Sequence, residues 1–311
     1  MNLGGFLRTF DPSNPSELAF SMHEKWVAVH PVVLAFTASV ADCVSAKGGE
    51  HTGEVTNVGS LPYLIRMGLF EHLKLPPGKR ITAHEAAGRF IPLQRISSTD
   101  DLTRFIVDMI PLLHASPTEV EPVRYVISEL VRNVFEHASS ARGAFIAAQY
   151  FKRSNTLGIG VCDSGIGIRE SLSRHHTVPT HSDAVYKALV PGISGTTSRL
   201  GGTAYNAGAG LFFTKSIAAA SRNYFTVYTG DALFKLRPTP PKQPILLFAD
   251  AERDRHTMET GLPNWNGTLV GIDISLSKGT TFAALMDLIR KVFGKSIRKE
   301  KQKPMIRPRF T

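Results

Sequence analysis

The spacing of apolar residues predicts both helices and strands along this chain. Apolar positions recur at helical spacing in the segments 61–73, 117–139, 183–189, 209–221 and 281–294. Short apolar runs predict buried strands over 143–151, 157–162, 223–229, 232–237, 244–249 and 268–275. The most apolar stretch, from Val27 to Val44, fits either a buried helix or a buried strand.

The order of these elements divides the chain into three parts. Residues 1–115 mix helix-like and strand-like runs, which predicts a small α/β domain. Residues 116–285 run helix, strands, long loop, helix and strands. This order predicts an α+β domain, a two-layer sandwich of helices on a mixed sheet. Residues 286–311 form a basic C-terminal tail.

The composition is that of an ordinary folded protein. Hydrophobic residues make up 42% and charged residues 20% of the chain, which excludes a largely disordered or fibrous protein. The two cysteines are too few for a disulfide framework or a four-thiolate metal site, which favours a reducing compartment. The first residues lack the long apolar core expected of a signal peptide, and we expect the stretch from Val27 to Val44 to be too polar to span a membrane. We therefore expect a soluble, cytoplasmic protein without membrane insertion.

The positive charge is concentrated at one end of the chain. The formal net charge is +10, and the segment from Arg290 to Thr311 carries nine Lys or Arg residues against one acid. Three interpretations stay open for this tail: a solvated segment, a weak polyanion or nucleic-acid contact, or a docking site for an acidic protein.

The first candidate motif lies on the predicted helix 117–139. Glu129, Asn133 and His137 recur every four residues, so all three project from one stripe of the helix. Polar residues of three chemistries on one stripe indicate a site, although a solvated helix face has the same pattern.

Three further motifs are strand or helix ends that contain glycine. Asp163 ends an apolar strand and is followed by Gly165 and Gly167, which let the backbone approach a ligand. Gly208 and Gly210 precede a predicted helix whose free N–H groups can bind an anion. A late strand opens with the pair Gly267–Thr268.

In this order and spacing, the four motifs resemble those of the GHKL superfamily of ATP-binding proteins. That superfamily includes DNA gyrase, mismatch-repair ATPases, histidine kinases and anti-sigma-factor serine kinases, and its ATP-binding domain has the Bergerat fold. The resemblance covers roughly residues 116–280 and is nearest to the anti-sigma-factor and soluble histidine-kinase types. It implies that the chain binds ATP and Mg²⁺.

The resemblance also implies roles for single residues. Asn133 corresponds to the residue whose side-chain oxygen binds Mg²⁺, and Glu129 to the acid that polarises a water or a substrate hydroxyl. Asp163 corresponds to the acceptor for the adenine amino group, with Thr268 in support. The other implied nucleotide contacts are His137, Gly165, Gly167, Ile168, Gly208, Gly210, Leu211 and Lys215. Residues 169–207 would form the ATP lid.

Some charged residues outside the motifs are weaker candidates. Arg174 and Arg199 in the lid are possible phosphate contacts, whereas the lid histidines His175, His176 and His181 are expected to be solvated. The pair His23–Glu24 is expected to be structural and not a phosphoacceptor, because no paired long helices accompany it.

Two functions follow from the resemblance. The first is an Mg²⁺-dependent ATPase or protein kinase with Glu129 as the base, acting on an unidentified protein phosphoacceptor. The second is a regulatory protein in which ATP orders the lid and a partner protein is engaged with little turnover. The pattern of residues 1–115 also faintly resembles STAS-like regulatory modules.

Overall fold

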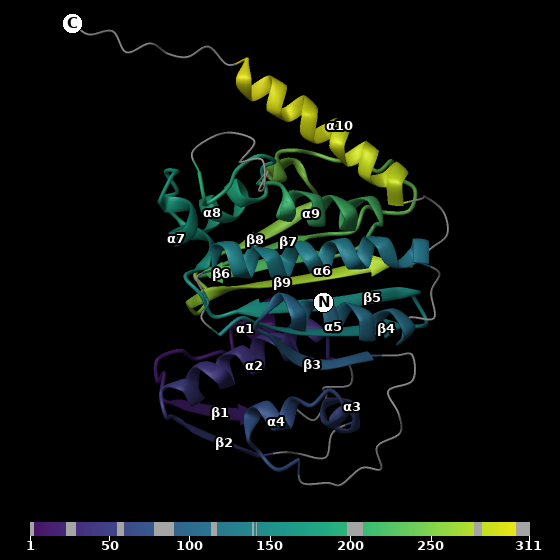
Figure 1. The fold of residues 1–311 in the computed structure, drawn as a ribbon. Helices are drawn as coiled ribbons and strands as arrows, with labels where there is room; N and C mark the ends of the chain where they lie inside the picture. Colours follow the sequence, from purple (N-terminus) through teal and green to yellow (C-terminus); the bar gives the residue numbers. More distant parts are fainter. Residues whose placement is uncertain are drawn as a thin grey trace, which may run out of the picture.

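A single antiparallel sheet forms the centre of the molecule (Figure 1). The computed structural model describes residues 3–22, 29–54, 59–77, 90–112, 117–138, 140, 142–197, 208–276 and 282–302. The seven strands in spatial order are β3 (Phe90–Ile96), β4 (Ala144–Phe151), β5 (Thr156–Asp163), β9 (Trp265–Ser275), β6 (Phe225–Gly230), β7 (Ala232–Leu236) and β8 (His256–Glu259). Every neighbouring pair is antiparallel, so the expectation of a mixed sheet is wrong. The short turns after β4 and β6 account for two of these pairs, because a tight hairpin joins only antiparallel strands.

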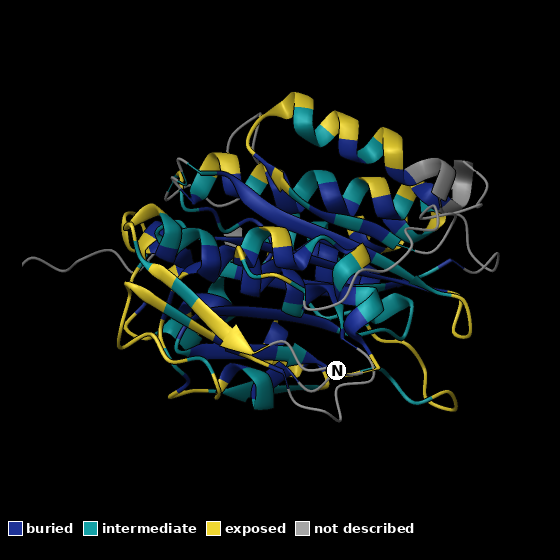
Figure 2. Cartoon of the chain, turned by 90° about the horizontal axis from the view of Figure 1, so that it is seen from below, coloured by how far each residue is buried: buried dark blue, intermediate teal, exposed yellow. Residues whose placement is uncertain are grey.

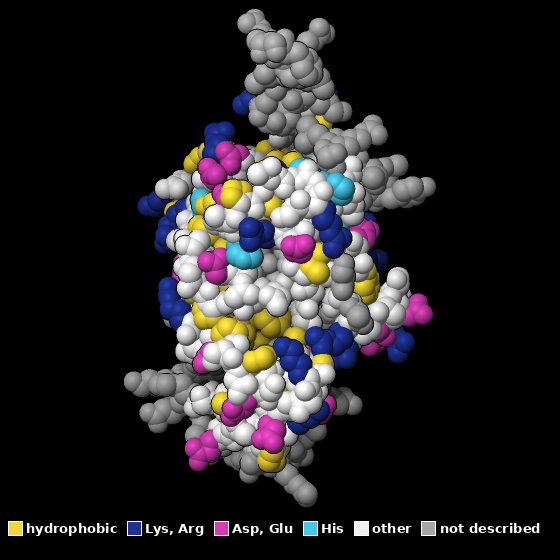
Figure 3. Space-filling model, turned by 90° about the vertical axis from the view of Figure 1, so that its left-hand side faces the viewer, with side chains coloured by type: hydrophobic (Ala, Val, Ile, Leu, Met, Phe, Trp, Pro, Cys, Tyr) yellow, Lys and Arg dark blue, Asp and Glu magenta, His cyan; other side chains and the backbone are white. Residues whose placement is uncertain are grey.

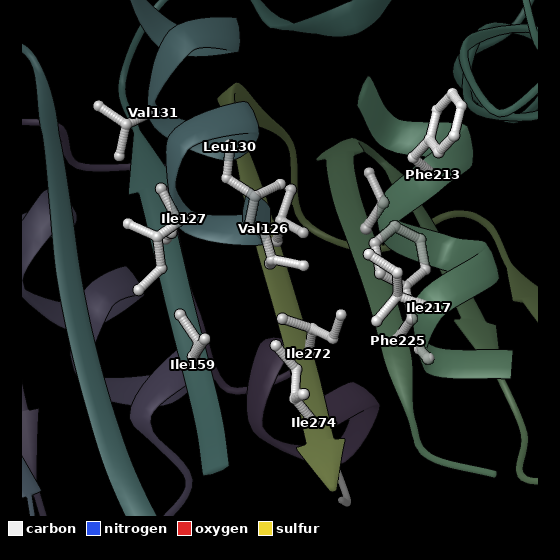
Figure 4. Close-up of a cluster of buried hydrophobic side chains, with 14 of the residues drawn as sticks. Val126, Ile127, Leu130, Val131, Ile159, Phe213, Ile217, Phe225, Ile272 and Ile274 are labelled. Carbon is white, nitrogen blue, oxygen red and sulfur yellow. The ribbon is translucent and has the colours of Figure 1, made fainter. Parts of the chain in front are cut away.

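A layer of helices covers one face of the sheet. Its members are α5 (Thr99–Leu112), α6 (Pro117–His137), α7 (Gly167–Ser173), α8 (His181–Ala188), α9 (Gly210–Ala220) and α10 (Phe282–Lys301). The expected long helix appears as α6, whose apolar face includes Val126, Ile127 and Leu130. These side chains pack with Ile159 of β5 and Ile272 of β9 in the larger core (Figure 4). Burial of this face leaves the stripe that carries Glu129 and Asn133 free to line a site.

The N-terminal region covers the opposite face of the sheet. It comprises α1 (Leu3–Leu7), β1 (Glu17–Ser21), α2 (Pro31–Ala46), β2 (Glu50–Glu54), α3 (Leu61–Arg66) and α4 (Leu69–Leu73). From Pro31 on, the apolar stretch that fitted helix or strand is the helix α2, which packs on β4 and β5. β1 and β2 pair in parallel as a small sheet below α2 (Figure 1), and most of its residues are exposed (Figure 2). The sheet therefore carries helices on both faces, whereas two layers were expected.

The expected boundary near residue 115 does not separate two sheets. β3 belongs to the first 115 residues, yet it pairs with β4 at the edge of the main sheet. A second apolar core, on the α2 side, joins Phe36 of α2 to Tyr228 and Trp265 of the main sheet. The N-terminal region and the sheet are thus packed together as one body.

The remaining differences concern segments with weak periodicity. Residues 244–249 are not a strand, and β8 takes the sheet edge instead. Prolines 238, 240, 241 and 244 explain this, since proline donates no backbone hydrogen bond to a sheet. Within the expected lid, the helix predicted near 183–189 is confirmed as α8, and α7 at the start of the lid is a helix that the pattern did not predict.

The start of the expected C-terminal tail belongs to the folded body. α10 runs through it, and Met286 and Ile289 are buried against the helical layer. Basic residues such as Lys291 and Lys295 occupy its exposed face. On the face of the molecule that carries α7 and α8, by contrast, basic and acidic side chains are interspersed (Figure 3).

Candidate functional site

A cavity of about 300 Å³ lies between the helical layer and the sheet. This volume is within the range of small-molecule sites. Ten of the expected contacts line it: Glu129, Asn133, His137, Asp163, Gly167, Ile168, Gly208, Gly210, Leu211 and Thr268. They come from α6, β5, α7, α9, β9 and the turn before α9, so the fold brings all four sequence motifs to one place.

The polar stripe of α6 forms one wall of the cavity. Glu129, Asn133 and His137 all line it, as their four-residue spacing predicts. The N-terminus of α9 lies directly against this stripe, because a Cβ on Gly210 would be 2.7 Å from Glu129 Oε2 and 3.4 Å from Asn133 Oδ1. Glycine at 210 therefore lets the first turn of α9, with its unpaired N–H groups, approach the carboxylate and the amide.

Asp163 marks the opposite end of the cavity. β5 carries this residue into the interior, where it is only 3% exposed. Gly165 does not line the cavity, but its N–H donates to Asp163 Oδ1 at 2.8 Å. Burial raises the pKa of Asp163 to about 6, and hydrogen bonds from the backbone of Gly165 and Thr268 oppose this shift. A carboxyl so placed can accept a hydrogen bond from a ligand amine.

The two turns near Asp163 are held together by Thr229, a residue outside all four sequence motifs. Thr229 Oγ1 donates to Gly267 O at 2.9 Å and accepts the N–H of Ile168 at 3.2 Å. Gly167, at a φ of +75°, lies so close that a Cβ would be 2.6 Å from Asn266 O. A side chain at 167 would separate the turns, so this glycine is required by close backbone contact.

The segment after α8 closes another side of the cavity. The N–H of Gly192 donates to Gly208 O at 2.9 Å, which places Ile193, Ser194 and Gly195 along the lining. His176 of the expected lid contacts Ser194 O through Nε2 at 3.0 Å. His176 thus has a structural contact here, although it was expected to be solvated.

Lys215 does not reach the cavity. Its side chain is 1% exposed and forms an ion pair with Asp254, and its Nζ also donates to Phe248 O at 3.0 Å. Burial lowers the pKa of Lys215, whereas the Asp254 carboxylate raises it. The expected nucleotide contact is therefore a buried ion pair that fastens α9 to the segment before β8.

Arg132 lines the cavity although no motif included it. It lies three residues after Glu129 on α6, and its Nη2 donates to Glu129 Oε1. It is the only Lys or Arg in the part of the lining that the structure describes. Its spacing of one helical turn from Glu129 was the available signal in the sequence.

Asn133 has the character of a ligand-binding residue. Its Nδ2 is buried and has no hydrogen-bond partner among the described residues. An unsatisfied buried amide is costly, so a ligand group that pairs with it would stabilise the site. The described part of the chain holds no group of three or more His, Cys, Asp or Glu residues that could hold a metal ion. An Mg²⁺ ion here would depend on Asn133, phosphate oxygens and water, a set of ligands that Mg²⁺ accepts.

His137 is the third member of the stripe. Burial lowers its pKa, the neighbouring Glu136 carboxylate opposes the shift, and Arg132 adds to it. The imidazole is therefore biased towards its neutral form, which can donate or accept a hydrogen bond at the cavity wall.

Several expected residues fall outside the cavity or outside the described chain. Arg174 and His175 are described but do not line the cavity. Residues 198–207, which include Arg199, lie outside the described residues, as do His23–Glu24 and the end of the tail from 303 to 311.

No protein-family model and no curated protein matches this chain. Within the described residues, no helix combines the length and the apolar character needed to cross a membrane.

Proposed function

We propose that this protein binds ATP with Mg²⁺ in the cavity, as a GHKL-type ATPase or protein kinase of the cytoplasm. The observation that carries the proposal is the distance along α6 between the two ends of the cavity, which differ in their chemistry. Glu129 faces the start of α9, and Ala138, nine residues later, contacts the Asp163 turn through the hydrogen bond from Ile166 N to Ala138 O at 2.9 Å. At 1.5 Å per residue these ends are roughly 14 Å apart, about the length of an extended nucleoside triphosphate.

Each end of the cavity suits one part of that ligand. The Asp163 carboxylate, which lines the cavity, would accept a hydrogen bond from the adenine amino group. The first turn of α9 would bind phosphate through its N–H groups. Bound Mg²⁺ would neutralise phosphate charge. The Glu129 carboxylate would take the proton from a water or from a protein hydroxyl.

The state of the two cysteines supports the compartment. Both cysteines are free thiols in the structure, and Cys162 is buried beneath α2. Free thiols are typical of a reducing compartment such as the cytoplasm.

The proposal is tested by replacing the adenine acceptor. Asp163→Asn should weaken ATP binding by about 10- to 150-fold, since a charged acceptor becomes a mixed amide. Isothermal titration with Mg²⁺ and ATP measures this, and Asp287→Asn on the exposed face of α10 is the matched control. Equal ATP affinity of the parent and Asp163→Asn would overturn the placement of adenine.

A second candidate function is an ATP-gated regulator with little turnover. The ion pair between Arg132 and Glu129 favours it, because a carboxylate that already accepts a guanidinium hydrogen bond is a poorer base. Release of labelled phosphate, or its transfer to protein in a lysate, separates the two functions. If the protein is an enzyme, Glu129→Gln should bind ATP and lose at least about 100-fold in turnover, because a general base contributes on that order. A parent protein that binds ATP without any turnover would favour the regulator.

A further inference from the structure

We propose that Arg132 recognises the terminal phosphate of the nucleotide and exchanges its partner Glu129 for that phosphate. The inference rests on the proposed function and assigns a residue that none of the four sequence motifs contains. Arg132 would thereby couple the arrival of the nucleotide to the release of the Glu129 carboxylate.

The positions of the two side chains on α6 support this exchange. Glu129 and Arg132 lie one turn apart and both line the cavity. One carboxylate oxygen, Oε1, accepts the hydrogen bond from Arg132, and the other, Oε2, faces Gly210 at the start of α9. Phosphate bound at α9 would therefore lie beside the same carboxylate that Arg132 holds.

The cavity needs a cation to bind phosphate, because its described lining carries more acidic than basic side chains. The described lining contains the acids Glu129, Glu136 and Asp163, but its only Lys or Arg is Arg132. Lys215, the other basic candidate, is committed to Asp254 away from the cavity. A triphosphate entering this lining meets one described guanidinium, whose planar donors fit phosphate oxygens in pairs.

Unequal burial allows one partner to move. The Arg132 side chain is 47% exposed, whereas that of Glu129 is 13% exposed and packed beside α9. The guanidinium can change rotamer in solvent while Glu129 stays in place. Once its Oε1 is released, Glu129 can accept a proton from a water or hydroxyl next to the phosphate.

Titrations with nucleotides of different length test the phosphate contact. Arg132→Ala should weaken the binding of Mg²⁺–ATP by about 10- to 100-fold, as expected for the loss of a charge-assisted pair. It should weaken the binding of adenosine by less than about twofold. The preference of the parent for ATP over ADP should disappear in the variant. Arg124→Ala is the matched control, because Arg124 is exposed on the same helix and does not line the cavity. Circular dichroism confirms that each variant is folded.

The outcomes separate this inference from the proposed function. A parent that binds neither ATP nor adenosine would overturn the proposed function. A parent that binds ATP, with Arg132→Ala binding it equally well, would overturn only the role of Arg132.

A double-mutant cycle tests the exchange of partners. If Arg132 must leave Glu129, Glu129→Gln should tighten ATP binding by about two- to tenfold in the parent and by less in the Arg132→Ala background. If Glu129 merely repels phosphate, the gain should be larger in the Arg132→Ala background, because the carboxylate is unpaired there. That second result, or no gain in either background, would overturn the exchange.

Discussion

Asp163 has a consequence for stability that can be measured without any ligand. Its pKa in the folded protein is about 6 because of burial, above the ordinary value near 4 of an unfolded chain. The unfolded state therefore loses its proton first as the pH rises. Asp163 thus favours folding below about pH 4, and this contribution is lost as the pH rises to about 6.

The prediction is a pH-dependent difference between the parent and Asp163→Asn. A shift of about two units corresponds to about 3 kcal/mol, so the free energy of unfolding of the parent should fall by about that much relative to the variant between pH 4 and pH 7. Urea unfolding at a series of pH values measures the difference. A difference that does not change with pH would show that Asp163 titrates normally.

At the scale of elements, α9 depends on the buried pair of Lys215 and Asp254. Both side chains are at most 3% exposed, and the pair joins α9 to the segment before β8. Lys215→Met should lower the free energy of unfolding by about 3–5 kcal/mol, since it leaves a buried carboxylate without its partner. Thermal or urea unfolding measures this loss.

The double variant Lys215→Met/Asp254→Leu distinguishes a structural pair from a nucleotide contact. It should recover most of the lost stability, because two apolar side chains replace two buried charges. It should also bind ATP as the parent does. A large loss of ATP affinity in this stable double variant would return Lys215 to the nucleotide site.

At the scale of the whole molecule, α10 is part of the body rather than an appendage. Ile289 is fully buried against the helical layer, and its neighbour Leu288 is 48% exposed. Ile289→Ala should cost about 2–5 kcal/mol of unfolding free energy, whereas Leu288→Ala should cost well under 1 kcal/mol. Equal effects of the two substitutions in urea unfolding would show that α10 does not pack as the structure has it.

Local chemistry explains how much of the site the sequence could predict. A four-residue period fixes one face of a helix wherever that helix lies, so Glu129, Asn133 and His137 could be assigned to one stripe. Asp163 could be placed at the end of a buried strand, since a continuous apolar run precedes it and forms β5. Gly210 was expected to open a helix that binds an anion, and the structure adds that the missing side chain leaves room for Glu129.

By itself, the sequence determined the positions of most helices and strands and the polar stripe of α6, because these depend on neighbours a few residues apart. Only the tertiary structure decided which distant groups meet. Lys215 lies 39 residues before Asp254, and no local pattern connects them. β3 joins the main sheet, and α2 covers its second face, through contacts between segments far apart in the chain. The free energy of such contacts comes from burial and from charges brought together by folding, and periodicity along the chain does not record it.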